Sequence, residues 1–266
     1  MKPLNECPAD SLRRIKGVLC DIDDTLSWQG KLPAIAYTAL ENLRAAGLIV
    51  VPITGRPAGW CDHIARMWPV DGVVGENGAF YFHYHAVSRK MRREYWRTDE
   101  QRKIDRDRLE RVGERILKEV IGTAVSADQG YREADLAIDF CEDVDHLPMA
   151  DVTRIVDIFR SEGAIAKISS IHVNGWYGDY DKLSMTRRML KDLFEMDIDA
   201  DAGGMAFVGD SPNDAPMFDF FPHSIGVSNV MDFSDSMEAL PAWVTGKPGG
   251  AGFAEFADAL LEAKKQ

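Results

Sequence analysis

Three carboxylates follow two largely apolar runs of the chain. Asp21 and Asp23 come directly after residues 15–20, and Asp210 closely follows residues 205–208. If both runs are strands of one parallel sheet, their carboxyl ends meet at one edge and the three side chains gather there. Such a cluster repels itself when partly buried, and a divalent cation relieves the repulsion. Because hard oxygen ligands with open water positions suit Mg²⁺, the sequence predicts a magnesium site.

Groups suited to binding an anion are expected at the same edge. Thr54 offers a hydroxyl at the end of another apolar run, 48–53, and the backbone N–H of Gly55 can approach an anion closely. Lys182, at the start of a predicted helix, adds a positive charge. Acids with a metal, a hydroxyl, an amide and a lysine are typical of phosphoryl transfer, where positioning and charge neutralisation supply most of the catalysis.

The elements that position these groups alternate between strand and helix. Strands are predicted at 15–20, 48–53 and 72–74, with helices between Pro33 and Gly47 and over 57–67. Short links between such elements are typical of a doubly wound parallel sheet. The alternation resumes at 182 with a helix, a strand at 205–208 and further helices.

The segment between about 80 and 180 has a different pattern. It is predicted to form an α+β module, an antiparallel sheet with helices on one face, in which residues 164–173 are extended. The fold class is therefore α/β, a doubly wound parallel-sheet core with an inserted α+β cap. We expect residues 1–81 and 181–266 to form the discontinuous core and residues 82–180 the cap.

Three residues of the last cap strand are candidates for substrate contact. His172, Asn174 and Trp176 alternate along the chain, so they share one face, which could present polar and aromatic groups toward the phosphate site. The alternative is that they form only a strand surface and an interface with the core.

Composition excludes several partners. The formal net charge is −12, whereas nucleic-acid binding needs a basic footprint. No run of about 18 apolar residues is found and no signal segment is evident, so no membrane partner is expected. The four cysteines show no metal-site or disulfide spacing, which indicates the reducing cytoplasm. Residues 89–118 hold an excess of bases inside the predicted cap. We favour a solvated surface for its arginines, and contact with an anionic substrate is the alternative hypothesis.

Four motifs in this order resemble those of the haloacid dehalogenase superfamily of phosphohydrolases. They are Asp21-Ile22-Asp23-Asp24-Thr25, Thr54-Gly55-Arg56, Lys182 and Gly209-Asp210-Ser211-Pro212-Asn213-Asp214. A module inserted between the second and third motifs, together with Glu76-Asn77-Gly78, resembles subclass IIB. That group includes Cof-type phosphatases, sucrose- and trehalose-phosphate phosphatases, mannosyl-3-phosphoglycerate phosphatase and eukaryotic phosphomannomutases.

The resemblance implies roles for the matching residues. Asp21 would be the nucleophile that forms an aspartyl-phosphate, and Asp23 the acid/base that protonates the leaving oxygen and then activates water. The residues implied to bind the phosphoryl group are Thr54, Gly55, Lys182 and Asn213. The residues implied to bind Mg²⁺ are Asp21, Asp23 through its backbone carbonyl, Asp210 and Asp214.

These expectations point to a Mg²⁺-dependent phosphatase that acts on a small phosphorylated metabolite, a sugar phosphate. A phosphomutase using the same aspartyl-phosphate is the first alternative. A non-catalytic phospho-accepting signalling domain is the second, because receiver domains also use acids, Thr and Lys on a doubly wound sheet. The third predicted strand is followed by Glu76-Asn77 rather than by a phospho-accepting Asp, which disfavours the second alternative.

Overall fold

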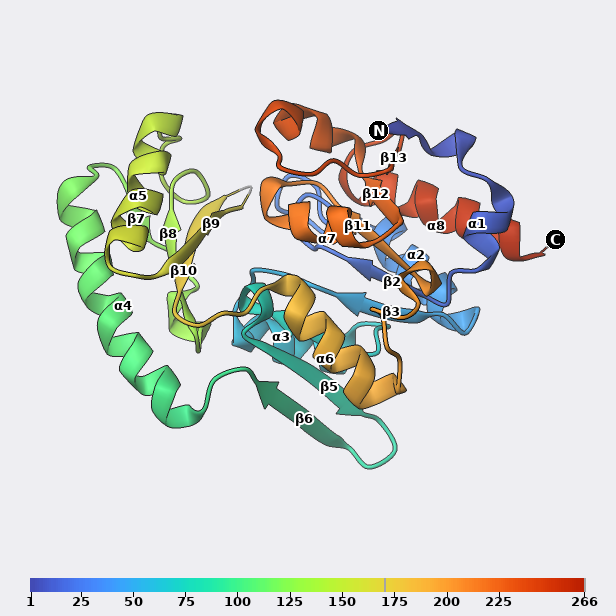
Figure 1. Ribbon diagram of the computed structural model, residues 1–266, viewed down its shortest axis with the longest axis horizontal. Coiled ribbons are helices and arrows are strands. Elements are labelled where there is room, and N and C mark those ends of the chain that lie inside the picture. The colour runs from blue at the N-terminus through green and yellow to red at the C-terminus, as the bar shows by residue number, and fades with distance from the viewer. Residues whose placement is uncertain (170, 266) are drawn as a thin grey trace.

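The core is a parallel six-stranded sheet with the strand order β1-β13-β12-β11-β2-β3 (Figure 1). The computed structural model describes residues 1–169 and 171–265. All five pairings in this sheet are parallel, and the order is the one that a doubly wound chain produces. Its strands are β1 (Lys2–Pro3), β2 (Gly17–Cys20), β3 (Ile49–Pro52), β11 (Met205–Gly209), β12 (His223–Gly226) and β13 (Trp243–Val244).

Helices cover both faces of this sheet because its central strands are buried on both sides. On one face, Val18 and Cys20 of β2 belong to a core cluster that includes four helices, α1 (Ala9–Arg13), α2 (Ala34–Ala45), α3 (Ala58–Met67) and α8 (Gly249–Lys265). On the other face, Leu19 packs in a cluster with α6 (Lys182–Phe194) and α7 (Ala215–Phe220). Alternate residues of one apolar strand therefore serve two separate hydrophobic layers.

An antiparallel hairpin extends the core beside β3. β4 (Val73–Gly75) pairs with β5 (Phe80–His85), which pairs with β6 (Lys90–Tyr95), and a bridge between Ile53 and Val74 joins β4 to the end of β3. Phe80 and Phe82 pack in the cluster that contains α3, and Tyr81 packs against α6. Since this hairpin packs within the core, we propose that the cap begins after Tyr95, later than the boundary at 82 expected from the sequence.

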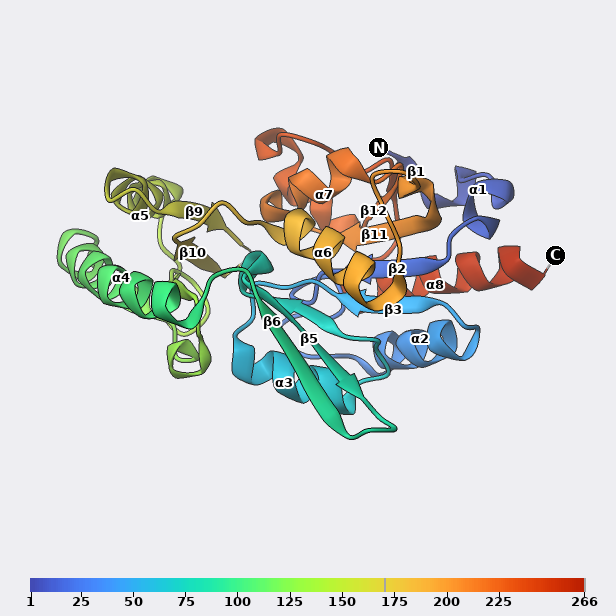
Figure 2. The same ribbon diagram turned by 60° about the horizontal axis from the view of Figure 1, so that its bottom comes forward.

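The inserted module is a four-stranded antiparallel sheet with the order β7-β8-β10-β9, backed by two helices (Figures 1 and 2). Its elements are α4 (Asp99–Glu119), β7 (Ala124–Val125), β8 (Asp135–Asp139), α5 (Met149–Ser161), β9 (Ile165–Ile168) and β10 (His172–Trp176). Leu136, Ile138 and Val173 pack against α4 and α5, and the intervening residues of β8 and β10 lie on the opposite face. The predicted fold class is therefore confirmed.

One strand prediction in the cap is wrong. Residues 164–173 were expected to be extended throughout, but they divide between β9 and β10, which pair antiparallel, with Val173 opposite Ile168. The Ser169 N–H donates to the carbonyl of His172, so the chain reverses between these two strands. β9 has the sequence Ile-Ala-Lys-Ile and β10 the sequence His-Val-Asn-Gly-Trp, and neither Gly nor Pro stands between them to mark a turn. Residue 170 lies outside the described residues.

The remaining short elements are 3-10 helices: η1 (Leu4–Glu6), η2 (Glu76–Gly78), η3 (Gln129–Tyr131), η4 (Ala202–Gly204), η5 (Pro212–Asp214) and η6 (Ser228–Ser236). No helix in the described part of the chain is both long and apolar enough to span a bilayer.

Gly175 is required by close packing between β10 and α5. A Cβ atom at this position would lie 2.1 Å from the ring of Phe159, which is fully buried. We expect Gly175→Ala to lower the free energy of unfolding by about 1–3 kcal/mol, because the ring has no space to move. Urea unfolding followed by circular dichroism measures this. Gly130→Ala is the matched control, since a Cβ there meets nothing within 4 Å. Equal stability of the two variants would contradict the packing argument.

Candidate active site

Three buried carboxylates meet at the carboxyl edge of the core sheet. Asp21 follows β2, Asp210 follows β11, and Asp214 ends η5 shortly afterwards. One carboxylate oxygen of each lies within 4.8 Å of the other two. The structure thus brings together three of the four residues that the sequence suggested as metal ligands.

The negative charges of these three carboxylates outnumber the positive charges next to them. Burial raises the pKa of the Asp21 carboxyl to about 8, and the Asp214 and Asp23 carboxylates add to the rise, although Lys182 acts against it. Burial also raises the pKa of Asp210, as does repulsion from Asp21 and Asp214. Both shifts reflect the cost of holding several negative charges away from water. Three oxygen donors in this arrangement fit a divalent cation such as Mg²⁺, whose charge relieves that cost.

Lys182 supplies the one lysine charge in contact with these acids. Its Nζ donates to Oδ1 of Asp21 and to Oδ1 of Asp214, both at 2.7 Å, and lies 3.4 Å from Oδ1 of Asn213. Burial lowers the pKa of Lys182, but the two carboxylates outweigh it and hold the pKa above its ordinary value. Asp181 caps the start of α6 by accepting from the Ser184 N–H, so the lysine stands on a fixed first turn.

Two residues without a role in the sequence predictions hold Asp210. The Thr25 hydroxyl donates to Oδ1 at 3.0 Å, and Nδ2 of Asn229 donates to Oδ2 at 3.2 Å and to the carbonyl of Asp24 at 3.0 Å. Asn229 lies in η6, just past the end of β12. Its position after an apolar strand of the same sheet was the available signal, but a single Asn in that place is too common to single out.

Asp23 points away from the carboxylate cluster, toward Arg56. The Nε and Nη2 of Arg56 donate to its carboxylate at 3.0 and 2.8 Å. The same guanidinium binds two cap residues, Glu142 at 3.0 Å and Asp128 at 3.4 Å. Asp23 is therefore oriented by an arginine that is itself held by the cap. Arg56 belongs to the Thr-Gly-Arg motif, but its cap partners lie too far along the chain for local sequence to indicate them.

A small pocket of about 20 Å³ lies above Asp21, between core and cap. Asp23, Gly55 and Asn213 line it from the core side. Thr54 is fully buried just beneath, where its Oγ1 accepts from the Arg56 N–H at 3.0 Å, and it is not one of the lining residues. A volume of this size holds about one or two water-sized groups.

The cap candidates lie on the sheet face that faces the core, as their alternation suggested, but in different environments. His172 and Asn174 line the small pocket. Nε2 of His172 is 2.9 Å from Glu142, and Nδ2 of Asn174 donates to Asp135 at 2.9 Å. Trp176 is buried in the core cluster, where it stacks on Tyr180, and it does not line the pocket.

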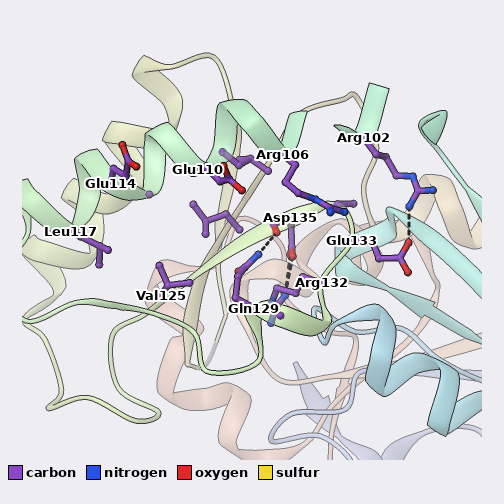
Figure 3. A pocket seen from close by; sticks show the side chains of 15 residues that line it. Arg102, Arg106, Glu110, Glu114, Leu117, Val125, Gln129, Arg132, Glu133 and Asp135 are labelled. Carbon is purple, nitrogen blue, oxygen red and sulfur yellow. Dashed lines mark hydrogen bonds and ion pairs between the residues drawn. The ribbon is translucent and has the colours of Figure 1, made fainter. Parts of the chain in front are cut away.

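Arg132 and Glu76 join the cap to the core. Arg132 pairs with Asp128 and Asp135, and its Nη1 donates to the carbonyl of Gly55 at 2.8 Å. The buried Glu76 carboxylate accepts from the backbone N–H groups of cap residues 133–135 and of Ala58. Arg132 also lines a cavity of about 430 Å³ that opens between α4 and residues 125–136 (Figure 3).

The basic stretch at 89–118 does not line the pocket that contains Asp21. Arg93 pairs with Asp62, Arg97 with Asp105, and Arg92 with Glu94. These arginines pair with nearby acids of α3, the hairpin and α4 instead of lining the pocket that contains Asp21.

Comparisons with known proteins agree with this arrangement. The family model of the haloacid dehalogenase-like hydrolases matches residues 18–109, a range that carries the first two motifs. Solved structures with the same fold include a protein of Thermoplasma acidophilum, at 18% identity and a TM-score of 0.70, covering 93% of this chain and 98% of that one. The family prediction is confirmed. Residues 18–109 of this chain thus match the haloacid dehalogenase-like hydrolases, the family that the four motifs resemble.

Two further solved structures share the fold of this chain over core and cap together. A haloacid dehalogenase-like hydrolase from Bacteroides thetaiotaomicron is 14% identical, with a TM-score of 0.62, covering 92% of this chain and 98% of that one. The sucrose-phosphatase of Synechocystis sp. PCC6803, solved with sucrose and phosphate, is 13% identical with a TM-score of 0.63 over the same shares. No curated protein matches this chain in sequence.

Proposed function

We propose that this protein is a Mg²⁺-dependent phosphatase that cleaves a small phosphorylated metabolite, a sugar phosphate, through an aspartyl-phosphate on Asp21. The observation that carries the proposal is the position of Asp21. Its carboxylate lies against Lys182 on one side and within reach of Asp210 and Asp214 on the other, at the base of a pocket that Asp23 also lines. A nucleophile, a fixed cation, a metal-ligand set and a second carboxylate are the groups that phosphoryl transfer requires.

The chemistry divides into two steps at Asp21. In the first, a carboxylate oxygen of Asp21 forms a bond to phosphorus while the ester P–O bond breaks, and Asp23 gives its proton to the departing alcohol oxygen. In the second, Asp23 takes a proton from water as that water attacks the phosphorus, which releases inorganic phosphate and restores Asp21. Lys182 offsets the negative charge that the phosphoryl oxygens bring into the site.

Mg²⁺ would be held by Asp21, Asp210, Asp214 and the backbone carbonyl of Asp23, and it would supply charge neutralisation at the transferring group. Thr25 and Asn229 orient Asp210 by hydrogen bonds to both of its carboxylate oxygens. The phosphoryl-binding groups in this proposal are Lys182, Thr54, Asn213 and the N–H of Gly55. For its location in the cell we retain the cytoplasm as a proposal, on the cysteine spacing alone.

The deciding experiment is phosphate release from sugar monophosphates by the purified protein in Mg²⁺. We expect continuous release of inorganic phosphate at many turnovers per enzyme molecule, because water completes the second step. A coupled phosphate assay, run beside nuclear magnetic resonance of the sugar, separates hydrolysis from transfer. Isomerisation of the sugar phosphate without release of phosphate would overturn the proposal in favour of a phosphomutase.

A further inference from the structure

A large cavity opens directly beside the candidate catalytic groups. It has a volume of about 590 Å³ and lies between α3, the loop after β2 and the cap. Asp23 and Arg56 line both this cavity and the 20 Å³ pocket above Asp21, so the two spaces meet at their ion pair. We name it the aromatic cavity, because Trp60, Trp68 and Tyr131 line it.

The position of Asp23 indicates what the aromatic cavity is for. The pocket above Asp21 is too small for more than the group being transferred. An acid that protonates the ester oxygen must lie within hydrogen-bond reach of it, so the rest of the substrate begins next to Asp23. The aromatic cavity is the large space that adjoins that carboxylate, and its volume is that of an ordinary small-molecule site.

Aromatic side chains from both core and cap form its walls. Trp60 on α3 is 43% exposed and Tyr131 of the cap is 62% exposed, although both are large and apolar. Tyr131 packs directly over Gly59. A Cβ atom added at Gly59 would lie 3.0 Å from the Cβ of Tyr131. The Arg56 guanidinium stacks on the Trp60 ring at 4.4 Å, which holds that ring beside Asp23. Exposed indole and phenol faces around a cavity are suited to a flat apolar ligand surface.

The charges that line the cavity select against an anionic ligand. Asp23 and Glu142 are acidic, Arg56 is the one lysine or arginine among the described lining residues, and His63 also lines the cavity. The Arg56 guanidinium is already paired with Asp23, Glu142 and Asp128. A second phosphate or a carboxylate on the substrate would therefore meet two acids and an arginine that is already paired, whereas an uncharged ring can pack on the aromatic faces without bringing a further charge into the cavity.

We propose that the aromatic cavity binds the leaving group of the substrate, and that this group is an uncharged ring with an apolar face, either an aryl alcohol or a pyranose. The inference rests on the proposed phosphatase function and narrows its substrate class. It excludes bisphosphates and phosphorylated acids as preferred substrates, and with them the ligand that a sugar phosphomutase requires.

Matched pairs of esters test the proposal on the full chain in Mg²⁺. One arm compares phenyl phosphate with 4-carboxyphenyl phosphate, and the other compares glucose 6-phosphate with glucose 1,6-bisphosphate. We expect kcat/KM to be at least tenfold higher for the uncharged member in at least one arm, and that arm identifies the ring. Equal or higher kcat/KM for the charged member in both arms would overturn the proposal.

A substitution of Trp60, which lines the aromatic cavity, tests whether this cavity causes the preference for uncharged ring esters. Trp60→Ala is expected to lower the ratio of kcat/KM for the preferred ring ester to that for acetyl phosphate roughly tenfold, because acetyl phosphate has no ring to stack. A general disturbance of Arg56 and Asp23 would slow both substrates and leave the ratio unchanged. Met67→Ala is the control, since Met67 is exposed on the same helix and does not line the cavity. An unchanged ratio in Trp60→Ala would contradict the assignment.

The assignment of the aromatic cavity and the proposed phosphatase function can be refuted separately. If the wild-type protein releases phosphate from none of these esters and not from acetyl phosphate, which is a mixed anhydride, the phosphatase proposal fails. The Asp21→Asn variant then still tests the cavity without turnover, by calorimetric titration with phenyl phosphate and 4-carboxyphenyl phosphate. A dissociation constant at least tenfold lower for the uncharged ester supports the assignment, and equal or reversed affinities overturn it.

Discussion

Replacing Asp21 by asparagine is expected to reduce kcat for phosphate release at least a thousandfold, which corresponds to about 4 kcal/mol in the activation barrier. The amide oxygen of asparagine is a far weaker nucleophile than a carboxylate, so the first bond to phosphorus does not form. The fold should be retained, because asparagine has nearly the same shape and its oxygen can still accept from Lys182, whose Nζ is 2.7 Å from Oδ1. A continuous phosphate assay at saturating substrate measures the loss.

The control for this variant is a chemically identical change outside the site. Asp10 on α1 has a side chain that is 85% exposed and lies far from the carboxylate cluster, so Asp10→Asn should keep wild-type kcat. Circular dichroism and thermal unfolding establish that both variants fold. A second readout is covalent: acid-quenched wild-type enzyme should carry labelled phosphate, and Asp21→Asn should carry none. Retention of more than about a tenth of kcat, or ~1.4 kcal/mol, would refute the nucleophile assignment.

The carboxylate cluster was predictable because the information for it is local. An apolar run followed directly by an acid predicts a buried strand with a carboxylate at its carboxyl end. Because parallel strands end at the same edge of a sheet, the carboxylates of two such strands lie close together. β2 and β11 are adjacent in the sheet, so Asp21 and Asp210 meet without any further signal. Lys182 was predictable for a similar reason, since it stands on the first turn of a helix that packs on the same sheet.

The groups that sequence reasoning left without a role depend on contacts between distant segments. Arg56 pairs with Asp128 and Glu142, which come from the cap, and nothing near Arg56 in the sequence indicates them. β6 was missed for a related reason. Its residues 90–95 are mostly charged, and they form a strand because the arginines stack over β5, Arg92 on Tyr81 and Arg93 on Phe82. Alternation along the strand predicted that Trp176 shares a face with His172 and Asn174. It could not predict that the core covers that face at Trp176, which is therefore buried away from the pocket.

Removal of the divalent cation is expected both to abolish phosphate release and to lower the stability of the folded state. Chelation with EDTA should reduce phosphate release at least a hundredfold, and added Mg²⁺ should restore it, because among the described residues Lys182 is the one lysine or arginine that pairs with the cluster of Asp21, Asp210 and Asp214. Mg²⁺ at a hundred times its dissociation constant adds about 2.7 kcal/mol to the stability of the folded state. For a chain of this size that raises the unfolding midpoint by roughly 5 to 10 °C.

Measuring both the unfolding midpoint and phosphate release distinguishes Mg²⁺ bound by the carboxylate cluster from a nonspecific effect of ionic strength. Asp210→Asn removes one of the three acids, so the Mg²⁺-dependent rise in the unfolding midpoint should largely disappear together with activity. Asp10→Asn should keep both, as its carboxylate lies on the surface. Differential scanning fluorimetry across a Mg²⁺ titration measures the first quantity, and the phosphate assay the second. Full activity in EDTA, or the same Mg²⁺-dependent shift in Asp210→Asn as in the wild type, would show that these acids are not the metal ligands. Burial and mutual repulsion of the carboxylates, with no bound metal, would then account for the raised pKa values of Asp21 and Asp210.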